Sequence, residues 1–118
     1  MKTRTILYLF AGITGLLFSC SDAKIVSGNY HGTLYASDTV EATIKIFEVN
    51  EGYIRLETTS PQMNQSYIDY AKLQKNSADA YNLYGANPSG GYHLTGYYYE
   101  SFLHVQSISN GYMFEGTK

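Results

Sequence analysis

The sequence predicts an all-β fold: an antiparallel up-and-down meander of about eight short strands that closes into a small barrel, with a β-sandwich as the alternative. Three observations predict it. Strand-favouring residues are frequent, and 13 of the 118 residues are tyrosine. No segment repeats apolar residues at the spacing of an amphipathic helix. Glycine and asparagine break the chain about every 12 residues, a spacing typical of sandwiches and barrels.

Turn-forming residues divide the chain into eight candidate strands. The breaks are "ASD", "NEG", "SPQMNQ", "KNSAD", "ANPSGG" and "SNG", and these contain the Gly, Pro, Asn, Asp and Ser that turns prefer. The strands are predicted at 26–35, 39–49, 53–59, 67–73, 80–84, 92–99, 102–108 and 112–117. The break at Glu100 and Ser101 has no strong turn residue, so the last three strands are alternatively two strands with a bulge.

Alternating side chains indicate that the strands are half-buried. Ile44 and Ile46 share one face while Lys45 lies on the other, and Ile54 alternates with Arg55 in the same way. Short connections favour antiparallel neighbours, because parallel strands need long crossovers. A transmembrane barrel would need an apolar outer band, so the charged faces favour a soluble barrel.

Residues 1–19 have the layout of a secretory signal peptide. A basic tip at Lys2 and Arg4 precedes an apolar run over 6–18, and a short polar end follows. This run of 13 residues is shorter than the roughly 20 that a membrane-spanning helix needs. We therefore expect residues 1–19 to be cleaved from the mature protein.

The end of this run, "LFSC" at 17–20, resembles the lipobox of bacterial lipoproteins. The resemblance implies cleavage before Cys20, acylation of Cys20 and membrane attachment through the lipid, with 20–24 as a short tether. The alternatives are a buried thiol or a disulfide, and no disulfide can form within the chain because Cys20 is its only cysteine. Ser21 resembles the outer-membrane sorting class, so the expected location is the cell outer membrane, in either leaflet.

The mature chain is expected to form a single all-β domain over 25–118. Loss of two basic residues with 1–19 leaves six basic against ten acidic residues, a formal charge of −4. An acidic surface argues against a nucleic-acid partner and against electrostatic docking on anionic lipid. The expected membrane link is therefore the lipid on Cys20.

The stretch "SGNYHGTLY" resembles a family signature. Gly28 and Tyr30 resemble the Gly-x-Trp motif of lipocalins and other calycins, and the run of strands ending in "MFEGTK" looks like small calycin-like lipoproteins. In that family the aromatic residue closes one end of the barrel and packs against a basic residue of the final strand, here Lys118. The resemblance implies a small or apolar ligand in the barrel mouth. An eight-stranded barrel can alternatively be filled by its own side chains.

The stretch "GGYHLTGYYYE" contains the candidate contact residues. Period-two alternation places His93, Thr95, Tyr97 and Tyr99 on one face. Tyrosine offers a rigid face with a hydrogen-bonding tip, so this face could stack on sugar rings or anchor a protein partner. The alternative is that these are ordinary cross-strand pairs. Gly96, on the opposite face, permits a bend or a close backbone approach.

No catalytic or metal-binding motif is found, so we expect no enzyme activity, no cofactor and no metal. The three histidines fall on different strands, without the spacing of metal ligands. Asp69, Glu57 and Glu100 are isolated acids, expected to be solvated rather than paired.

The function expected from the sequence is that of a lipid-anchored binding protein of the cell envelope. A small or apolar ligand in the barrel is the first hypothesis. The second is an inhibitor or immunity-type lipoprotein that binds a protein partner through a strand face. The third is a structural accessory of an outer-membrane complex.

Overall fold

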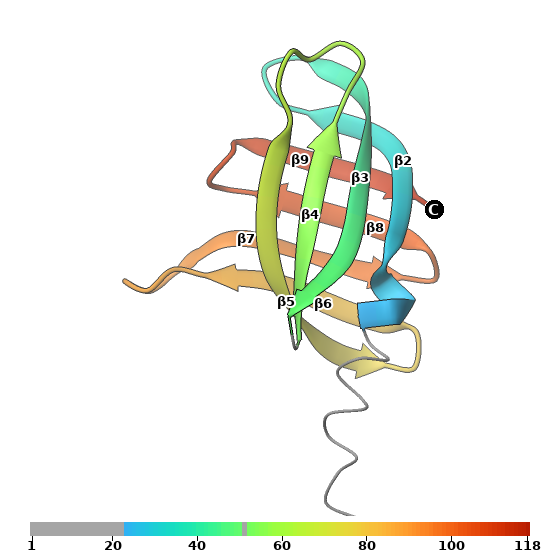
Figure 1. Cartoon of the computed structure of the whole chain (residues 1–118), viewed down its shortest axis with the longest axis vertical. Coiled ribbons are helices and arrows are strands. Elements are labelled where there is room, and N and C mark those ends of the chain that lie inside the picture. The colour runs from blue at the N-terminus through green and yellow to red at the C-terminus, as the bar shows by residue number, and fades with distance from the viewer. Residues whose placement is uncertain (1–22, 51) are drawn as a thin grey trace, which may run out of the picture.

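The computed structural model describes residues 23–50 and 52–118, and its strands form one closed antiparallel sheet (Figure 1). The strands are β2 (Gly28–Tyr35), β3 (Thr39–Asn50), β4 (Tyr53–Thr59), β5 (Tyr67–Ser77), β6 (Ala80–Ala86), β7 (Tyr92–Tyr99), β8 (Phe102–Ser107) and β9 (Tyr112–Thr117). Each strand pairs with the next, and β9 pairs back with β2. The fold is therefore the small up-and-down, calycin-like barrel that the sequence predicts, and not a sandwich.

Strand β5 differs most from its predicted length. The prediction ends it at Leu73, but Gln74 and Lys75 still pair with β6, and Ser77 pairs with Ala80 beyond a register shift. A β-bulge absorbs the extra residue at that shift. The turn-forming residues of "KNSAD" therefore lie mostly inside the hairpin arms, and only residues 78–79 form the loop.

The chain enters the barrel through a helical turn, so the predicted strand start at Val26 is wrong. Residues 23–26 are helical, the Ser27 amide donates to the Ala23 carbonyl at 2.9 Å, and Ala23 and Val26 are fully buried. Residues three apart on a helix share a face, which explains why both reach the core. Within the described residues, no helix is long and apolar enough to cross a membrane.

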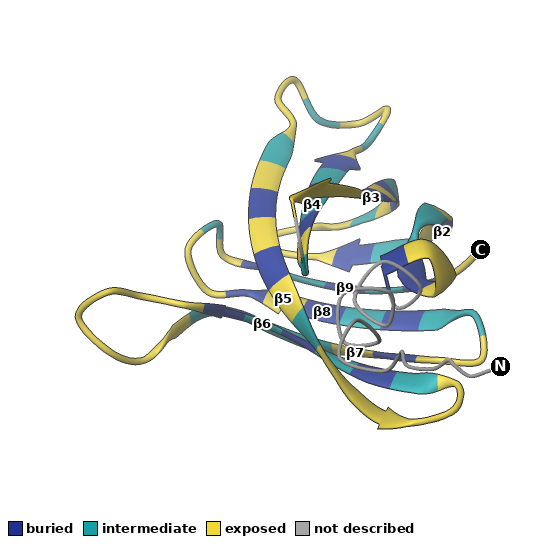
Figure 2. Cartoon of the chain, turned by 60° about the horizontal axis from the view of Figure 1, so that its bottom comes forward, coloured by how far each residue is buried: buried dark blue, intermediate teal, exposed yellow. Residues whose placement is uncertain are grey.

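Inward-facing side chains fill the barrel. Buried and exposed residues alternate along the strands, most visibly along β5 (Figure 2), as a half-buried strand requires. Tyr30, Tyr81 and Phe114 are the largest side chains that are fully buried. The ring of Tyr98 lies between two of these tyrosines, with its centroid 6.4 Å from that of Tyr30 and 6.0 Å from that of Tyr81.

The turn between β7 and β8 has only two residues, neither of them glycine. Glu100 and Ser101 have φ angles of 47° and 71°, as the tight turns that match the twist of a hairpin require. The last three strands are therefore separate, and the alternative of two strands with a bulge is wrong. Weak turn chemistry concealed the hairpin because Glu and Ser adopt positive φ at a cost.

Candidate functional site

The four predicted contact residues lie on the outer side of β7 but do not converge. Tyr97 and Tyr99 are 43% and 51% exposed, while His93 and Thr95 are half-buried. A strand rises about 3.3 Å per residue, so His93 and Tyr99 lie at opposite ends of the barrel. His93 and Tyr99 therefore belong to different neighbourhoods of the outer surface.

Tyr97 belongs to a cluster of rings on β7 and β8. Its ring stacks on that of His104, with 5.1 Å between centroids and 19° between planes, and lies 6.0 Å from Phe102. His104 Nδ1 lies 3.1 Å from a carboxylate oxygen of Glu115 on β9. The exposed Tyr97 ring is thus supported by β8, whose His104 is in turn held by β9.

His93 is held by the backbone and the loop beside it. Its Nε2 lies 3.3 Å from the Tyr70 carbonyl oxygen and its Nδ1 lies 3.2 Å from the Asn87 side-chain oxygen. A Cβ on Gly85 would lie 2.3 Å from the His93 ring. Glycine at position 85 therefore makes the room in which the imidazole sits.

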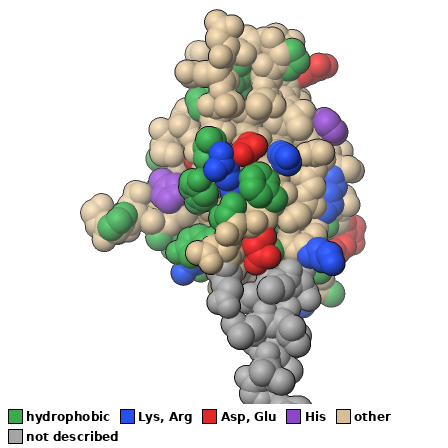
Figure 3. Space-filling model, viewed as in Figure 1, with side chains coloured by type: hydrophobic (Ala, Val, Ile, Leu, Met, Phe, Trp, Pro, Cys, Tyr) green, Lys and Arg blue, Asp and Glu red, His purple; other side chains and the backbone are tan. Residues whose placement is uncertain are grey.

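A second group of rings and cations lies on the outer side of β3, β4 and β5. The Arg55 guanidinium lies 6.0 Å from the centroid of Phe47 and 5.8 Å from that of Tyr70, and it donates to the Tyr70 hydroxyl at 3.2 Å. Lys72 Nζ lies 5.0 Å from the ring centroid of Tyr53. Figure 3 shows hydrophobic and basic side chains gathered on this face. Cation–ring contacts of this kind are attractive.

Glu57 is also part of this group, so the expectation that it is an isolated acid is wrong. Its carboxylate lies 2.8 Å from Arg55 Nε. Sequence reasoning missed the group because its members come from three strands. The register that pairs Arg55 with both Phe47 and Tyr70 brings them together.

We call these exposed and half-exposed rings and cations of β3–β8 the outer aromatic face, which wraps around the outside of the closed barrel from β3 to β8. Its members are Phe47, Tyr53, Arg55, Tyr70, Lys72, Tyr84, Tyr92, Tyr97, Phe102 and His104. The two groups above form its ends. Tyr84 and Tyr92 lie between them, on β6 and β7.

Two hollows open on the middle of this face. The larger, of about 620 Å³, is lined by Leu73, Gln74, Asn82, Leu83, Tyr84, Tyr92, Thr95 and Gly96. The smaller, of about 160 Å³, is lined by Tyr53, Tyr70, Ala71, Lys72, Tyr84, Gly85, Ala86 and His93. Both are lined by Tyr84, so the two hollows adjoin at this residue, and we call them together the groove across β5, β6 and β7. Of the predicted contact residues, His93 and Thr95 line it.

A buried polar cluster surrounds Asp69 at the loop end of the barrel, so the expectation that Asp69 is solvated is wrong. Asp69 is only 3% exposed. Its carboxylate accepts hydrogen bonds from the Tyr112 hydroxyl at 2.9 Å, the Ser107 hydroxyl at 3.1 Å and the Asn110 amide at 3.1 Å and 3.2 Å. Burial, and then the charge of Asp69, raises the pKa of the Tyr112 hydroxyl. The cluster ties β5 to the β8–β9 turn.

A small hollow lies at the mouth of the barrel, near this cluster. Its volume is about 120 Å³, and its lining includes Leu34, Val40, Met63 and Tyr67. Pockets that bind drug-sized ligands are usually about 300–1,000 Å³. The hollow is therefore small for such a ligand.

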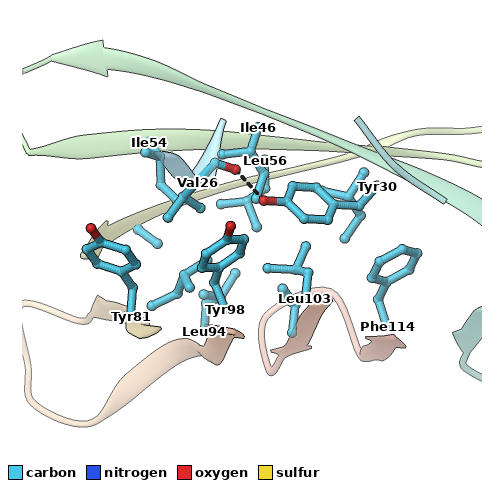
Figure 4. Packing of buried hydrophobic residues seen from close by; sticks show 14 of the residues in the cluster. Val26, Tyr30, Ile46, Ile54, Leu56, Tyr81, Leu94, Tyr98, Leu103 and Phe114 are labelled. Atoms are coloured by element: carbon cyan, nitrogen blue, oxygen red, sulfur yellow. Dashed lines mark hydrogen bonds between the residues drawn. The ribbon is translucent and has the colours of Figure 1, made fainter. Parts of the chain in front are cut away.

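The opposite end is closed by Tyr30 and Lys118. Tyr30 is fully buried, and its hydroxyl donates to the Val26 carbonyl (Figure 4). Lys118 Nζ lies 5.6 Å from the Tyr30 ring centroid and donates to the carbonyls of Ile25 and Ser27. These contacts have the aromatic–basic form that the calycin resemblance implies.

Burial shifts both ionisable groups at this end. It raises the pKa of the Tyr30 hydroxyl, and the neighbouring Tyr98 raises it further. It lowers the pKa of Lys118, against the smaller opposite effect of Asp79. A Cβ on Gly28 would lie 3.1 Å from the Lys118 side chain, so glycine leaves room for this lysine.

Among the described residues, no three or more His, Cys, Asp or Glu side chains lie close enough to hold a metal ion. The predicted lipidation site, Cys20, lies outside the described residues. Comparison with protein-family models, with curated proteins and with solved structures finds no match. The candidate site therefore has to be interpreted from its own geometry.

Proposed function

We propose that this protein is a lipid-anchored binding protein of the cell envelope that holds its partner on the outer aromatic face of a filled barrel. The carrying observation is the contrast between the two sides of the sheet. The inner side packs into one core, whereas the outer side carries rings, cations and a groove.

The exposed rings support this proposal. Tyr70, Tyr92 and Tyr97 are between 43% and 54% exposed. Tyrosine and arginine are enriched among the residues that contribute most to binding, and Arg55 lies beside Tyr70. A large apolar surface rimmed by polar groups is typical of an interaction site.

Radical footprinting of tyrosine tests the proposal. We expect Tyr70 and Tyr97 to be oxidised more slowly in the intact cell envelope than in the purified protein. Tyr35, 40% exposed on β2 and outside the outer aromatic face, is the control and should be oxidised equally in both. Equal oxidation of all three tyrosines in both samples would refute binding through this face.

A second candidate function is binding of an apolar ligand smaller than a drug-sized molecule in the barrel mouth, where the 120 Å³ hollow lies. Here the footprint should move to Tyr67, which lines that hollow. Native mass spectrometry of the protein from its own host should then show a bound small molecule, and Val40→Phe should displace it. Under the first proposal, Val40→Phe leaves the protection of Tyr70 and Tyr97 unchanged.

A further inference from the structure

We propose that the groove across β5, β6 and β7 binds an acidic oligosaccharide. In this arrangement the sugar rings lie against Tyr84 and Tyr92, and a carboxylate of the sugar lies beside Lys72. The inference rests on the proposed function in one respect only, that the outer aromatic face is a binding surface.

The groove has an open floor and raised walls. Leu73, Leu83 and Gly96 pair in register across the three strands, and their backbone lines the floor because these positions face the core. Gly96 adds no side chain, and a Cβ there would lie 2.4 Å from the His104 carbonyl oxygen. The close approach of β7 to β8 therefore requires glycine at this position.

Two tyrosine rings form an angle suited to sugar rings. The centroids of Tyr84 and Tyr92 lie 6.3 Å apart, and their planes are inclined by 85°. A pyranose has an apolar C–H face that packs on an aromatic ring and an edge of hydroxyls that needs hydrogen bonds. Tyrosine supplies both a rigid face and a polar tip.

The remaining lining is polar and uncharged in the larger hollow. Gln74, Asn82 and Thr95 place amide and hydroxyl groups around it, and such groups both donate and accept hydrogen bonds, as sugar hydroxyls do. A protein partner would instead favour an apolar anchor pocket. The lining therefore favours a carbohydrate over a protein.

The charges favour an acidic sugar. The residues that line the two hollows include no Asp or Glu, although the mature chain is acidic overall. Lys72 and His93 both line the smaller hollow, which joins the larger one at Tyr84. A carboxylate bound there would accept charge-assisted hydrogen bonds from the Lys72 ammonium.

The test measures binding of defined oligosaccharides to the full chain purified in detergent. The probes are tetragalacturonate and tetramannuronate, which carry carboxylates, and maltotetraose and chitotetraose, which do not. We expect at least one acidic probe to bind, and Tyr84→Ala and Tyr92→Ala each to weaken its binding about tenfold or more. Lys72→Gln should weaken binding of the acidic probe, while Tyr35→Ala should leave its binding unchanged.

The conservative variant Tyr84→Phe keeps the proposal testable if Tyr84→Ala does not fold. It keeps the ring, so we expect binding to stay within about threefold of the original. The proposal is overturned if no probe binds, or if neutral probes bind as tightly as acidic ones. It is also overturned if Tyr84→Ala and Tyr92→Ala bind the acidic probe as tightly as the original protein. If the footprint at Tyr70 and Tyr97 nevertheless persists, the proposed function stands and only the carbohydrate inference fails.

Discussion

The turn residues Glu100 and Ser101 hold an uncommon backbone conformation at the closed end of the barrel. Both have positive φ, which costs a non-glycine residue roughly 1–2 kcal/mol. The contacts around them retain it: the Glu100 amide donates to the Asp79 carbonyl at 3.3 Å, and the Lys118 amide donates to the Ser101 carbonyl at 3.1 Å. The turn is therefore strained locally and fixed by its neighbours.

Relieving this strain should stabilise the protein. Glycine adopts positive φ without a steric penalty but adds freedom to the unfolded chain, so Ser101→Gly should raise the free energy of unfolding by about 0.5–1 kcal/mol. Urea denaturation measures it. Ser37→Gly is the matched control, since Ser37 has no positive φ, and it should give no gain. A loss of stability in Ser101→Gly would contradict the strain.

The buried carboxylate of Asp69 should matter more than any exposed acid. Asp69→Ala would leave the donors of Tyr112, Ser107 and Asn110 without their acceptor, so we expect a loss of about 3 kcal/mol in the free energy of unfolding. Glu48→Ala, at an exposed position, is the control and should change stability by less than about 0.5 kcal/mol. Similar losses in both variants would mean that the cluster contributes little.

The burial of Asp69 could have been predicted from the sequence, but its hydrogen-bond partners could not. Period-two alternation along β5 puts Asp69 on the same face as Ala71, both of them buried, so its burial follows from the pattern. Its hydrogen-bond donors lie about 40 residues further along the chain. Only the barrel topology brings them to the carboxylate.

At the scale of the strands, local sequence chemistry predicted the strand bounds but not the groove. The bounds of β4, β7 and β9 match the prediction because Gly, Pro and Asn lie beside them or the period is clear. The groove depends on how three strands align, which turn lengths and bulges set. A strand's own residues do not determine that alignment, so Tyr84 and Tyr92 were not paired in advance.

The seam between β2 and β9 depends on two facing glycines. Gly32 pairs with Gly116, and a Cβ on Gly32 would lie 2.0 Å from the Glu115 carbonyl oxygen. We expect Gly32→Ala to force the strands apart and to lower the free energy of unfolding by about 3 kcal/mol. Amide hydrogen exchange should accelerate at β2 and β9 before the other strands. Thr33→Ala, the next residue, is the control and should leave exchange at the seam slow.

At the scale of the whole molecule, two buried tyrosine hydroxyls should make the barrel sensitive to alkali. The pKa values of Tyr30 and Tyr112 are raised in the folded state. The contribution of these hydroxyls to the free energy of unfolding is therefore complete below the ordinary pKa of about 10 and is lost as the pH rises above it. The pKa of Lys118 is lowered in the folded state, so its effect on stability with rising pH is opposite to that of the tyrosines. We expect the free energy of unfolding to fall above pH 10, and to fall less in Tyr112→Phe. An equal fall in Tyr112→Phe would exclude this contribution.

Under the proposed lipid anchor on Cys20, the fold also predicts which end of the barrel would face the membrane. Ala23 is buried at the closed end, and Lys118 bonds to the carbonyls of Ile25 and Ser27. The Cα atom of Cys20, three residues before Ala23, is at most about 11 Å away along the chain. A lipid on Cys20 would therefore hold the closed end against the membrane, with the barrel mouth directed away from it.

Brominated lipids test both the anchor and this orientation, because the chain contains no tryptophan. Tyr99→Trp places a fluorophore at the closed end and Ile108→Trp places one at the loop end. In vesicles, we expect strong quenching of the first and weak quenching of the second. Adding Cys20→Ala should release both from the vesicles and abolish the difference while the barrel stays folded, as far-UV circular dichroism would show. Quenching that survives Cys20→Ala would mean that another part of the chain holds the membrane.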